Sequence, residues 1–149
     1  MAIATETQSS AAAALQPSFS GIHHCSIIVT DLARADHFYR EVLGLKPIHK
    51  PRTFDFTVLW YQLGDQHVHL IPSSEADAVS PRHMALHVSD ARATRRYFKR
   101  LGIACRETTP IPGADRFFVS DPDGNLIECI QWLRPYDPEE NAPPRDAIP

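Results

Sequence analysis

The sequence has little of what marks a disulfide-rich, membrane-spanning or nucleic-acid-binding protein. Only three of its 149 residues are cysteines, Cys25, Cys105 and Cys129, and they form no C-x-x-C pair. An odd number without such a pair argues against a disulfide framework and for a reducing compartment, so we expect a cytoplasmic protein. No apolar run approaches the roughly 18 residues of a membrane span. The formal charge of −3 lacks the basic excess of a nucleic-acid-binding domain.

The two ends of the chain also have few residues that would pack into a core. Residues 1–20 are rich in Ala and Ser, and no Lys or Arg precedes their short apolar run from Ala11 to Leu15. This pattern fits neither a secretory signal nor a transit peptide, and it predicts a disordered leader. Residues 134–149 contain five prolines among mixed charges and are expected to form a loose tail. The intervening residues 21–133 have a length that suits one domain.

Turn residues and hydrophobic periodicity predict alternating strands and helices in this domain. Asp31 and Asp90 suit helix N-caps, and each precedes an apolar stripe at helical spacing that ends at a glycine. The stripes are Ala35, Phe38, Tyr39 and Val42 before Gly44, and Thr94, Tyr97, Phe98 and Leu101 before Gly102. Strands are predicted at 22–30, 56–63, 66–71, 83–89, 103–107, 115–119 and 126–132. The Pro- and Gly-containing segment 121–125 predicts a turn before the last strand.

An internal repeat of constant spacing runs through these elements. His24 and His83 are 59 residues apart (83 − 24), as are Asp31 and Asp90 (90 − 31), and all four stripe positions shift by the same number. The chain is therefore expected to be α+β, with two βαβββ modules at 21–72 and 83–133. Two paired modules imply a pseudo-twofold axis that brings equivalent strands face to face.

The last strand contains a carboxylate among apolar side chains. Leu126, Glu128, Ile130 and Trp132 share one face on a period of two. Burial of Glu128 is costly unless a cation compensates its charge. Its counterpart in the first module is His69 (128 − 59). If the first and last strands of each module are neighbours, and if the two sheets curl together, then His24, His69, His83 and Glu128 converge. This donor set suits a divalent metal such as zinc, nickel, iron, manganese or cobalt.

The other histidines and the cysteines have simpler interpretations. A single strand histidine is more often a packed or hydrogen-bonded residue than a ligand, and only the shared spacing favours the four residues above. His67 and His87 lie on the same faces as His69 and His83, so each is an alternative ligand or a pocket-lining base, although a solvated or core role is more typical. Cys25 and Cys129 lie on the opposite faces and are expected to be buried, inert thiols.

Four segments together resemble the vicinal oxygen chelate superfamily of glyoxalases, bleomycin-resistance proteins and extradiol dioxygenases. They are IHHCSIIVTDL from Ile22, FYREVLGL from Phe38, HMALHVSD from His83 and DPDGNLIE from Asp121, and the resemblance covers about residues 21–133. It implies paired βαβββ modules that form a cupped mixed sheet around a divalent metal, usually in a homodimer. His24, His69, His83 and Glu128 fall on the four ligand positions of the family.

The resemblance leaves three functions open. In a glyoxalase I, a metal-bound carboxylate shuttles a proton between adjacent carbons of a small substrate chelated through neighbouring oxygens, and Glu128 is the only carboxylate available for that role. An iron-dependent extradiol dioxygenase uses two histidines and one carboxylate, which His24, His83 and Glu128 match. A non-catalytic binding or resistance protein can dispense with the ligands, so four intact positions argue against it.

Two departures place the chain nearer to glyoxalase-I-like proteins than to lactoylglutathione lyase itself. Glyoxalase I often has Glu at the position of His69, which disfavours a mechanism with two carboxylates. Where it usually has an Arg and an Asn for glutathione, this chain has Ile28 and Ser73, so a charge-assisted partner of the glutathione carboxylates is missing. Arg52, Arg82 and Arg116 are the candidates to replace it.

Overall fold

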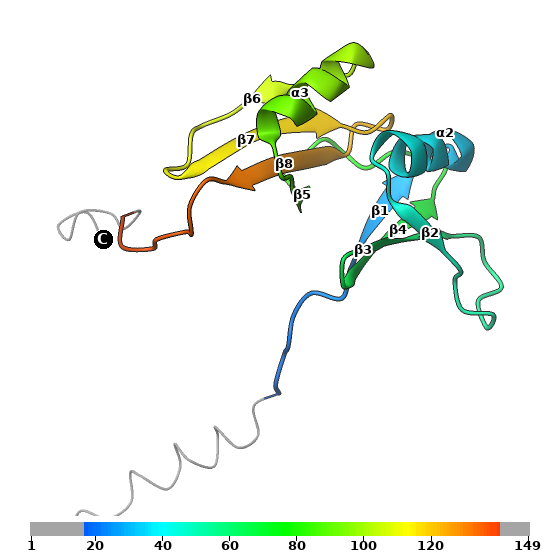
Figure 1. The fold of residues 1–149 in the computed structure, drawn as a ribbon. Coiled ribbons are helices and arrows are strands. Elements are labelled where there is room, and N and C mark those ends of the chain that lie inside the picture. Colours follow the sequence, from blue (N-terminus) through cyan, green and yellow to red (C-terminus); the bar gives the residue numbers. More distant parts are fainter. Residues whose placement is uncertain (1–16, 141–149) are drawn as a thin grey trace, which may run out of the picture.

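The computed structural model describes residues 17–140, and Figure 1 shows two sheets with helices on one side. The first module contains β1 (His24–Val29), α2 (Leu32–Asp36), the π-helix η1 (His37–Val42), β2 (Lys46–Ile48), β3 (Leu59–Leu63) and β4 (Gln66–Pro72). The second contains β5 (His83–His87), α3 (Ala91–Arg100), β6 (Arg106–Glu107), β7 (Ala114–Ser120) and β8 (Leu126–Trp132). The predicted leader and tail fall mostly on 1–16 and 141–149, outside the described residues.

The two sheets have the same topology. Their strand orders are β1-β4-β3-β2 and β5-β8-β7-β6, and in each the first pair is parallel while the others are antiparallel. Ser26 pairs with His69 and Ala85 pairs with Glu128, so the register is conserved at the spacing of 59 (85 − 26 and 128 − 69). The α+β class, the repeated modules and the neighbouring first and last strands are therefore confirmed.

Both helices begin as the sequence predicts, at aspartates that cap their first turns. The carboxylate of Asp31 accepts a hydrogen bond from the Arg34 amide at 3.0 Å, and Asp90 accepts one from the Ala93 amide at 2.8 Å. The first helix differs from the prediction after Asp36, because it continues as a π-helix in which the Leu43 amide donates to the Phe38 carbonyl. Among residues 17–140, none of the helices has the length and apolar character needed to cross a membrane.

Two strand predictions need correction, and one further strand is present that the sequence did not indicate. The strand expected at 56–63 begins only at Leu59, since Phe54 and Phe56 stack on each other in the preceding loop at 4.8 Å between ring centroids. The strand expected at 103–107 is reduced to β6, Arg106–Glu107. Strand β2 was not predicted at all: it has only three residues, and Pro47 is tolerated there because β2 lies at the edge of its sheet.

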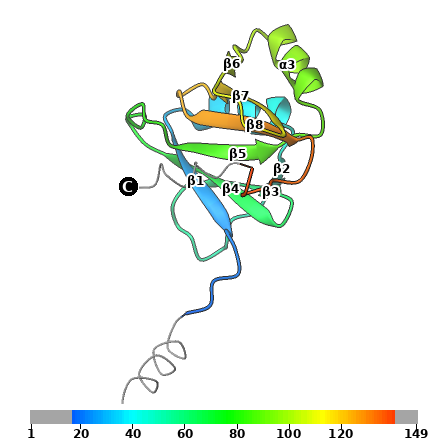
Figure 2. The same ribbon diagram turned by 90° about the vertical axis from the view of Figure 1, so that its left-hand side faces the viewer.

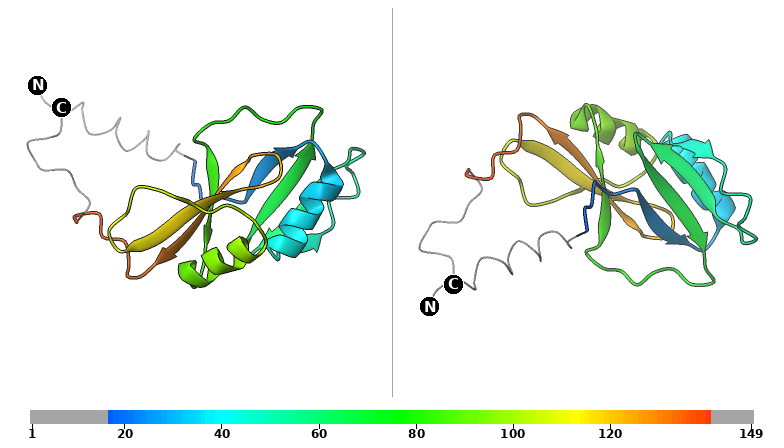
Figure 3. Two further views of the ribbon diagram at one scale, coloured as in Figure 1. Left: turned by 90° about the horizontal axis from the view of Figure 1, so that it is seen from above. Right: turned by 90° about the horizontal axis from the view of Figure 1, so that it is seen from below.

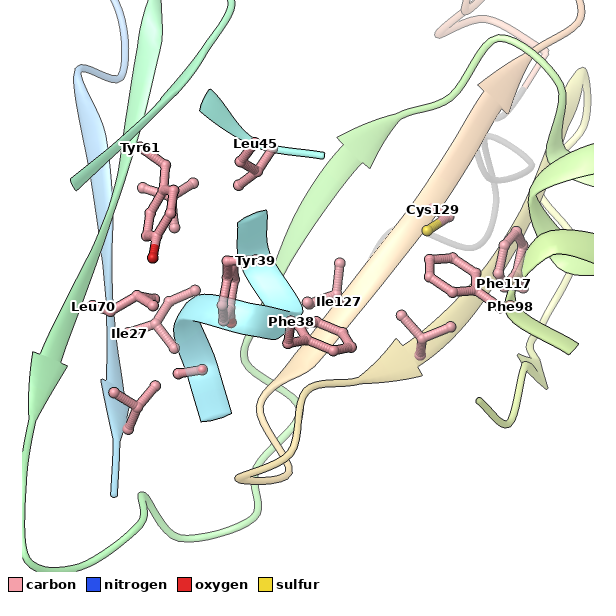
Figure 4. Close-up of a cluster of buried hydrophobic side chains, with 14 of the residues drawn as sticks. Ile27, Phe38, Tyr39, Leu45, Tyr61, Leu70, Phe98, Phe117, Ile127 and Cys129 are labelled. Carbon is pink, nitrogen blue, oxygen red and sulfur yellow. The ribbon is translucent and has the colours of Figure 1, made fainter. Parts of the chain in front are cut away.

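One continuous core joins the modules on the helix side of the sheets. Figure 4 shows the first helix between the two sheets, with Tyr39 near Tyr61 and Leu70 of the first module and Phe38 near Ile127 of the second. Each of these five side chains is buried. Cys129 lies in the same core, and burial raises the pKa of its thiol to about 11, so the thiol stays protonated at neutral pH. This agrees with the inert role predicted for it.

The turn before β8 holds the two modules together, and we call residues 121–125 the clasp. Asp121 is buried and accepts hydrogen bonds from the amides of Asp123 and Asn125 at 2.9 and 2.8 Å, and Gly124 adopts a φ of 88°. The clasp then reaches the first module. Tyr39 donates its hydroxyl to Asp121 Oδ2 at 2.9 Å, Arg34 pairs with Asp123 at 2.8 Å, and the Asn125 amide group donates to the Ile28 carbonyl at 2.9 Å.

The faces away from the helices are open in the single chain. Figure 2 shows the two sheets from another side, and the view from below in Figure 3 has strands rather than helices towards the viewer. On β1 and β5, His24, Ser26, His83, Ala85 and His87 are exposed there. His69 and Glu128 share these faces through their register with β1 and β5, but both are buried, each 6% exposed.

Candidate metal centre

His24 and His69 form the first half of the candidate site, on the parallel neighbours β1 and β4. Their rings stack with centroids 4.3 Å apart and planes 18° apart. Trp60 of β3 stacks on the other side of His69 at 3.9 Å and 7°. His69 is only 6% exposed, and its Nε2 is buried without a hydrogen-bond partner among the described residues. A buried ring nitrogen that lacks a partner is available to bind a metal ion.

Burial and neighbouring histidines keep the His69 imidazole neutral. Its pKa is lowered to about 4, first because burial disfavours the charged form and then because His24, His67 and His23 are nearby. A metal therefore does not have to displace a proton from His69 at neutral pH.

Two further histidines lie beside this pair. His23 bonds locally, with its Nδ1 3.0 Å from Nδ1 of His24. The His67 ring lies edge-on to that of His23, with centroids 5.0 Å apart, and its Nδ1 is buried without a partner among the residues described. His67 therefore remains an alternative donor on the same face as His69.

His83 and Glu128 form the second half of the candidate site, on β5 and β8. The Nδ1 atom of His83 lies 2.9 Å from the Pro81 carbonyl oxygen, which can only accept, so Nδ1 carries a proton. In the neutral ring, the lone pair of Nε2 then faces Glu128 Oε2 at 3.0 Å. Two electron-pair donors this close need a proton or a cation between them, and the distance fits two ligand atoms each about 2.0–2.2 Å from one ion.

Glu128 also has a cationic partner that the sequence did not identify. Nη1 of Arg116, on β7, donates to Glu128 Oε1 at 2.9 Å, and the Glu128 side chain is 8% exposed. The predicted compensating cation is thus present in part as a guanidinium. It leaves Oε2, the oxygen nearer His83, without a bond to arginine.

Within one chain the two halves stay apart. Among residues 17–140, no three His, Cys, Asp or Glu side chains are arranged to hold a metal ion together. A cleft of about 240 Å³ at the seam between the modules is lined by His83 but by none of the other three predicted ligands. The structure therefore pairs His24 with His69 and His83 with Glu128, and their convergence on one ion remains a prediction.

Sequence comparison identifies the family. Residues 21–129 match the profile of the Glyoxalase/Bleomycin resistance protein/Dioxygenase superfamily. The chain belongs to this superfamily. A "Probable lactoylglutathione lyase" of Vibrio cholerae is 31% identical over 123 residues, which cover 74% of this chain and 89% of that protein.

Solved structures of the superfamily fold are also similar. A "putative glyoxalase family protein" from Bacillus anthracis superposes with a TM-score of 0.72 and 26% identity, over 78% of this chain and 98% of that one. A lactoylglutathione lyase from Agrobacterium tumefaciens gives a TM-score of 0.63 and 26% identity, over 76% and 95% of the two chains. The chain is thus similar in sequence and in fold to proteins named as glyoxalases.

The departures from the glyoxalase I pattern of this superfamily can now be placed. Ile28 is half-buried on β1, and Ser73 is exposed just after β4, where its hydroxyl accepts from the Glu75 amide. Of the arginines considered as replacements, Arg116 is already bonded to Glu128, and Arg82 lies near Asp77 at 3.7 Å. Neither position 28 nor position 73 therefore presents a charged side chain.

Proposed function

We propose that this chain is a divalent-metal-dependent, glyoxalase-I-like enzyme that carries out an isomerase- or lyase-type proton transfer. Its substrate would be a small molecule chelated through neighbouring oxygens. The main support is the pair of half-sites at equivalent register. In them His69 presents a buried ring nitrogen without a partner among the described residues, and Nε2 of His83 lies 3.0 Å from a carboxylate oxygen of Glu128. The lactoylglutathione lyase names of related proteins support the reaction class.

His24, His69, His83 and Glu128 would hold the ion, which we expect to be zinc, nickel, iron, manganese or cobalt. When bound, such an ion polarises substrate oxygens and stabilises developing negative charge. The residues of the chain then have separate roles. Trp60 covers one face of the His69 ring and helps to exclude water from the first half-site.

Glu128 is the proposed proton shuttle, and its two oxygens are not equivalent. Oε1 is bonded to Arg116, whereas Oε2 faces His83 on the open side of the sheet. A guanidinium bond lowers the basicity of Oε1, and Oε2 would be the oxygen that binds the ion beside His83. The proposed proton transfer therefore uses Oε2 and requires Glu128 to loosen from the ion first.

A homodimer would complete the site. Each chain presents His24 with His69 on one open sheet face and His83 with Glu128 on another, and neither pair alone gives the three or four protein ligands of a typical zinc centre. In the proposed dimer, the first module of one chain faces the second module of its partner.

We place the protein in the cytoplasm, since its three cysteines are free thiols.

Metal analysis combined with a two-substrate screen tests the proposal. We expect about one divalent ion per chain, because the four ligands form one centre. His24→Ala and Glu128→Ala should abolish binding, while His49→Ala, which changes an exposed histidine outside both half-sites, should not. The loaded protein should isomerise the hemithioacetal formed from methylglyoxal and a thiol.

Two results would redirect the assignment. Oxygen uptake with a catechol, in the absence of isomerisation, would select the ring-cleaving dioxygenase. Metal-free protein that binds a small ligand with unchanged affinity would refute the enzyme and leave a binding protein.

A further inference from the structure

The Arg116 guanidinium is held on two sides. Its Nε and Nη2 atoms donate to the Thr109 carbonyl oxygen at 3.1 and 2.7 Å, and its Nη1 atom donates to Glu128 Oε1 at 2.9 Å. The Arg116 side chain is only 16% exposed. Because the backbone carbonyl of Thr109 anchors one edge of the planar fork, the remaining edge stays directed at Glu128.

This contact divides the Glu128 carboxylate between two partners. Arg116 bonds one oxygen, and the other lies 3.0 Å from the His83 ring nitrogen. In the metal-free chain, the guanidinium supplies much of the charge compensation that a buried carboxylate needs. In the metal-bound chain, a divalent ion and the guanidinium would share the same carboxylate, and their like charges would repel each other.

We propose that Arg116 is a positioning residue that stabilises the metal-free site and, by the same contact, weakens its affinity for divalent cations. The inference rests on the proposed function, because it concerns the affinity of that centre. Arg116 thereby keeps the ion exchangeable and keeps Glu128 in place when no ion is bound.

Two opposing effects decide whether replacing Arg116 raises or lowers the affinity for divalent metal. Loss of the anchor frees one carboxylate to rotate, which weakens metal binding only modestly. Loss of the positive charge removes repulsion between a unit charge and a double charge in a mostly buried site, where the effective permittivity is about 20 rather than 80. The electrostatic effect is the larger, so we expect Arg116→Ala to bind Co²⁺ at least about tenfold more tightly than the unaltered chain.

The experiment measures stability and metal affinity, which should change in opposite directions when Arg116 is replaced. Full-length chain freed of metal with a chelator is titrated with Co²⁺ to obtain the dissociation constant, and its melting temperature is measured before metal is added. Arg116→Ala should melt at a lower temperature than the unaltered chain, since Glu128 loses its partner, yet bind Co²⁺ more tightly. A merely structural arginine would lower both the stability and the affinity.

Arg34→Ala is the matched control, because Arg34 also pairs with a buried carboxylate, that of Asp123, outside the candidate centre. It should lower the melting temperature and leave Co²⁺ affinity within about twofold. Arg116→Gln keeps a polar side chain without the charge and should also bind more tightly. Arg116→Lys keeps the charge and should bind Co²⁺ like the unaltered chain. If the alanine variant does not fold, the glutamine and lysine variants together still test the proposal.

The outcomes separate the two proposals. If the unaltered chain binds Co²⁺ and the alanine and glutamine variants bind it equally or more weakly, the role of Arg116 is refuted and the metal centre stands. If the unaltered chain binds no divalent ion, both proposals fall together.

Discussion

Acidification should destabilise the metal-free protein through one histidine. The pKa of His69 is about 4 in the folded chain, against an ordinary value of 6.5, because burial and neighbouring histidines disfavour its charged form. As the pH falls below 6.5, the unfolded chain takes up this proton first. Stability from this group is therefore complete above pH 6.5 and is lost as the pH falls towards 4.

The size of this destabilisation follows from the shift in the pKa of His69. The difference between a pKa of 6.5 in the unfolded chain and about 4 in the folded chain corresponds to about 3 kcal/mol of unfolding free energy. Of this, about 2 kcal/mol is lost between pH 7.5 and pH 5. This is a large fraction of the about 5–15 kcal/mol that stabilises an ordinary domain. Urea unfolding of chelated protein at both pH values measures it directly.

His69→Gln isolates the contribution of this residue. The variant should lose about 2 kcal/mol less than the unaltered chain over the same pH interval, whatever its absolute stability. His49→Gln, which changes an exposed histidine away from the cluster, should keep the full pH dependence. Equal pH dependence in the unaltered chain and in His69→Gln would show that the buried imidazole is not the cause.

Two further predictions concern the assembly of the chain and of the dimer. Mixing His24→Ala chains with Glu128→Ala chains should restore metal binding at one of the two sites in each hybrid dimer, because one site then contains both intact halves. If hybrids form and do not bind metal, the site lies within a single chain. Tyr39→Phe should lower the unfolding free energy measured in urea by about 1.5–3 kcal/mol, because Tyr39 donates a hydrogen bond to a buried carboxylate. Tyr97→Phe loses a hydrogen bond to a neutral carbonyl and should lower it by about 0.5–1.5 kcal/mol. Equal losses would contradict this reasoning.

The sequence predicts the first and last strands of each module well because two independent patterns agree there. The period-two alternation assigns Glu128 to a face, and the constant spacing of 59 pairs it with His69. The parallel registers Ser26–His69 and Ala85–Glu128 preserve that spacing, so the residues chosen from sequence occur as two neighbouring pairs.

The contact between Arg116 and Glu128 could not be predicted in the same way. The hairpin between β3 and β4 turns through Gly64 and Asp65, whereas β7 and β8 are joined by the five residues of the clasp. As a result Trp60 pairs with His69 but Phe118 pairs with Glu128, one residue away from the constant spacing (60 + 59 = 119). The repeat therefore does not give the register of β7, and the face of Arg116 follows only from the structure.

Whether the two half-sites meet is decided by how chains assemble, and a pattern within one chain carries no information about that. The repeat predicts that equivalent strands face each other, but it holds equally for a site within one chain and for a site between two. The hybrid experiment distinguishes these arrangements because it changes one half-site in each partner.

The clasp makes the two modules of the chain non-interchangeable. Its receiving side chains, Arg34 and Tyr39, correspond to Ala93 and Phe98 in the second module (34 + 59 and 39 + 59), neither of which can make the same polar bonds. The first module in turn has only its two-residue hairpin where the second has the clasp. A chain rebuilt from two copies of either module would keep the sheet topology and lose these bonds, so the fold needs one module of each kind.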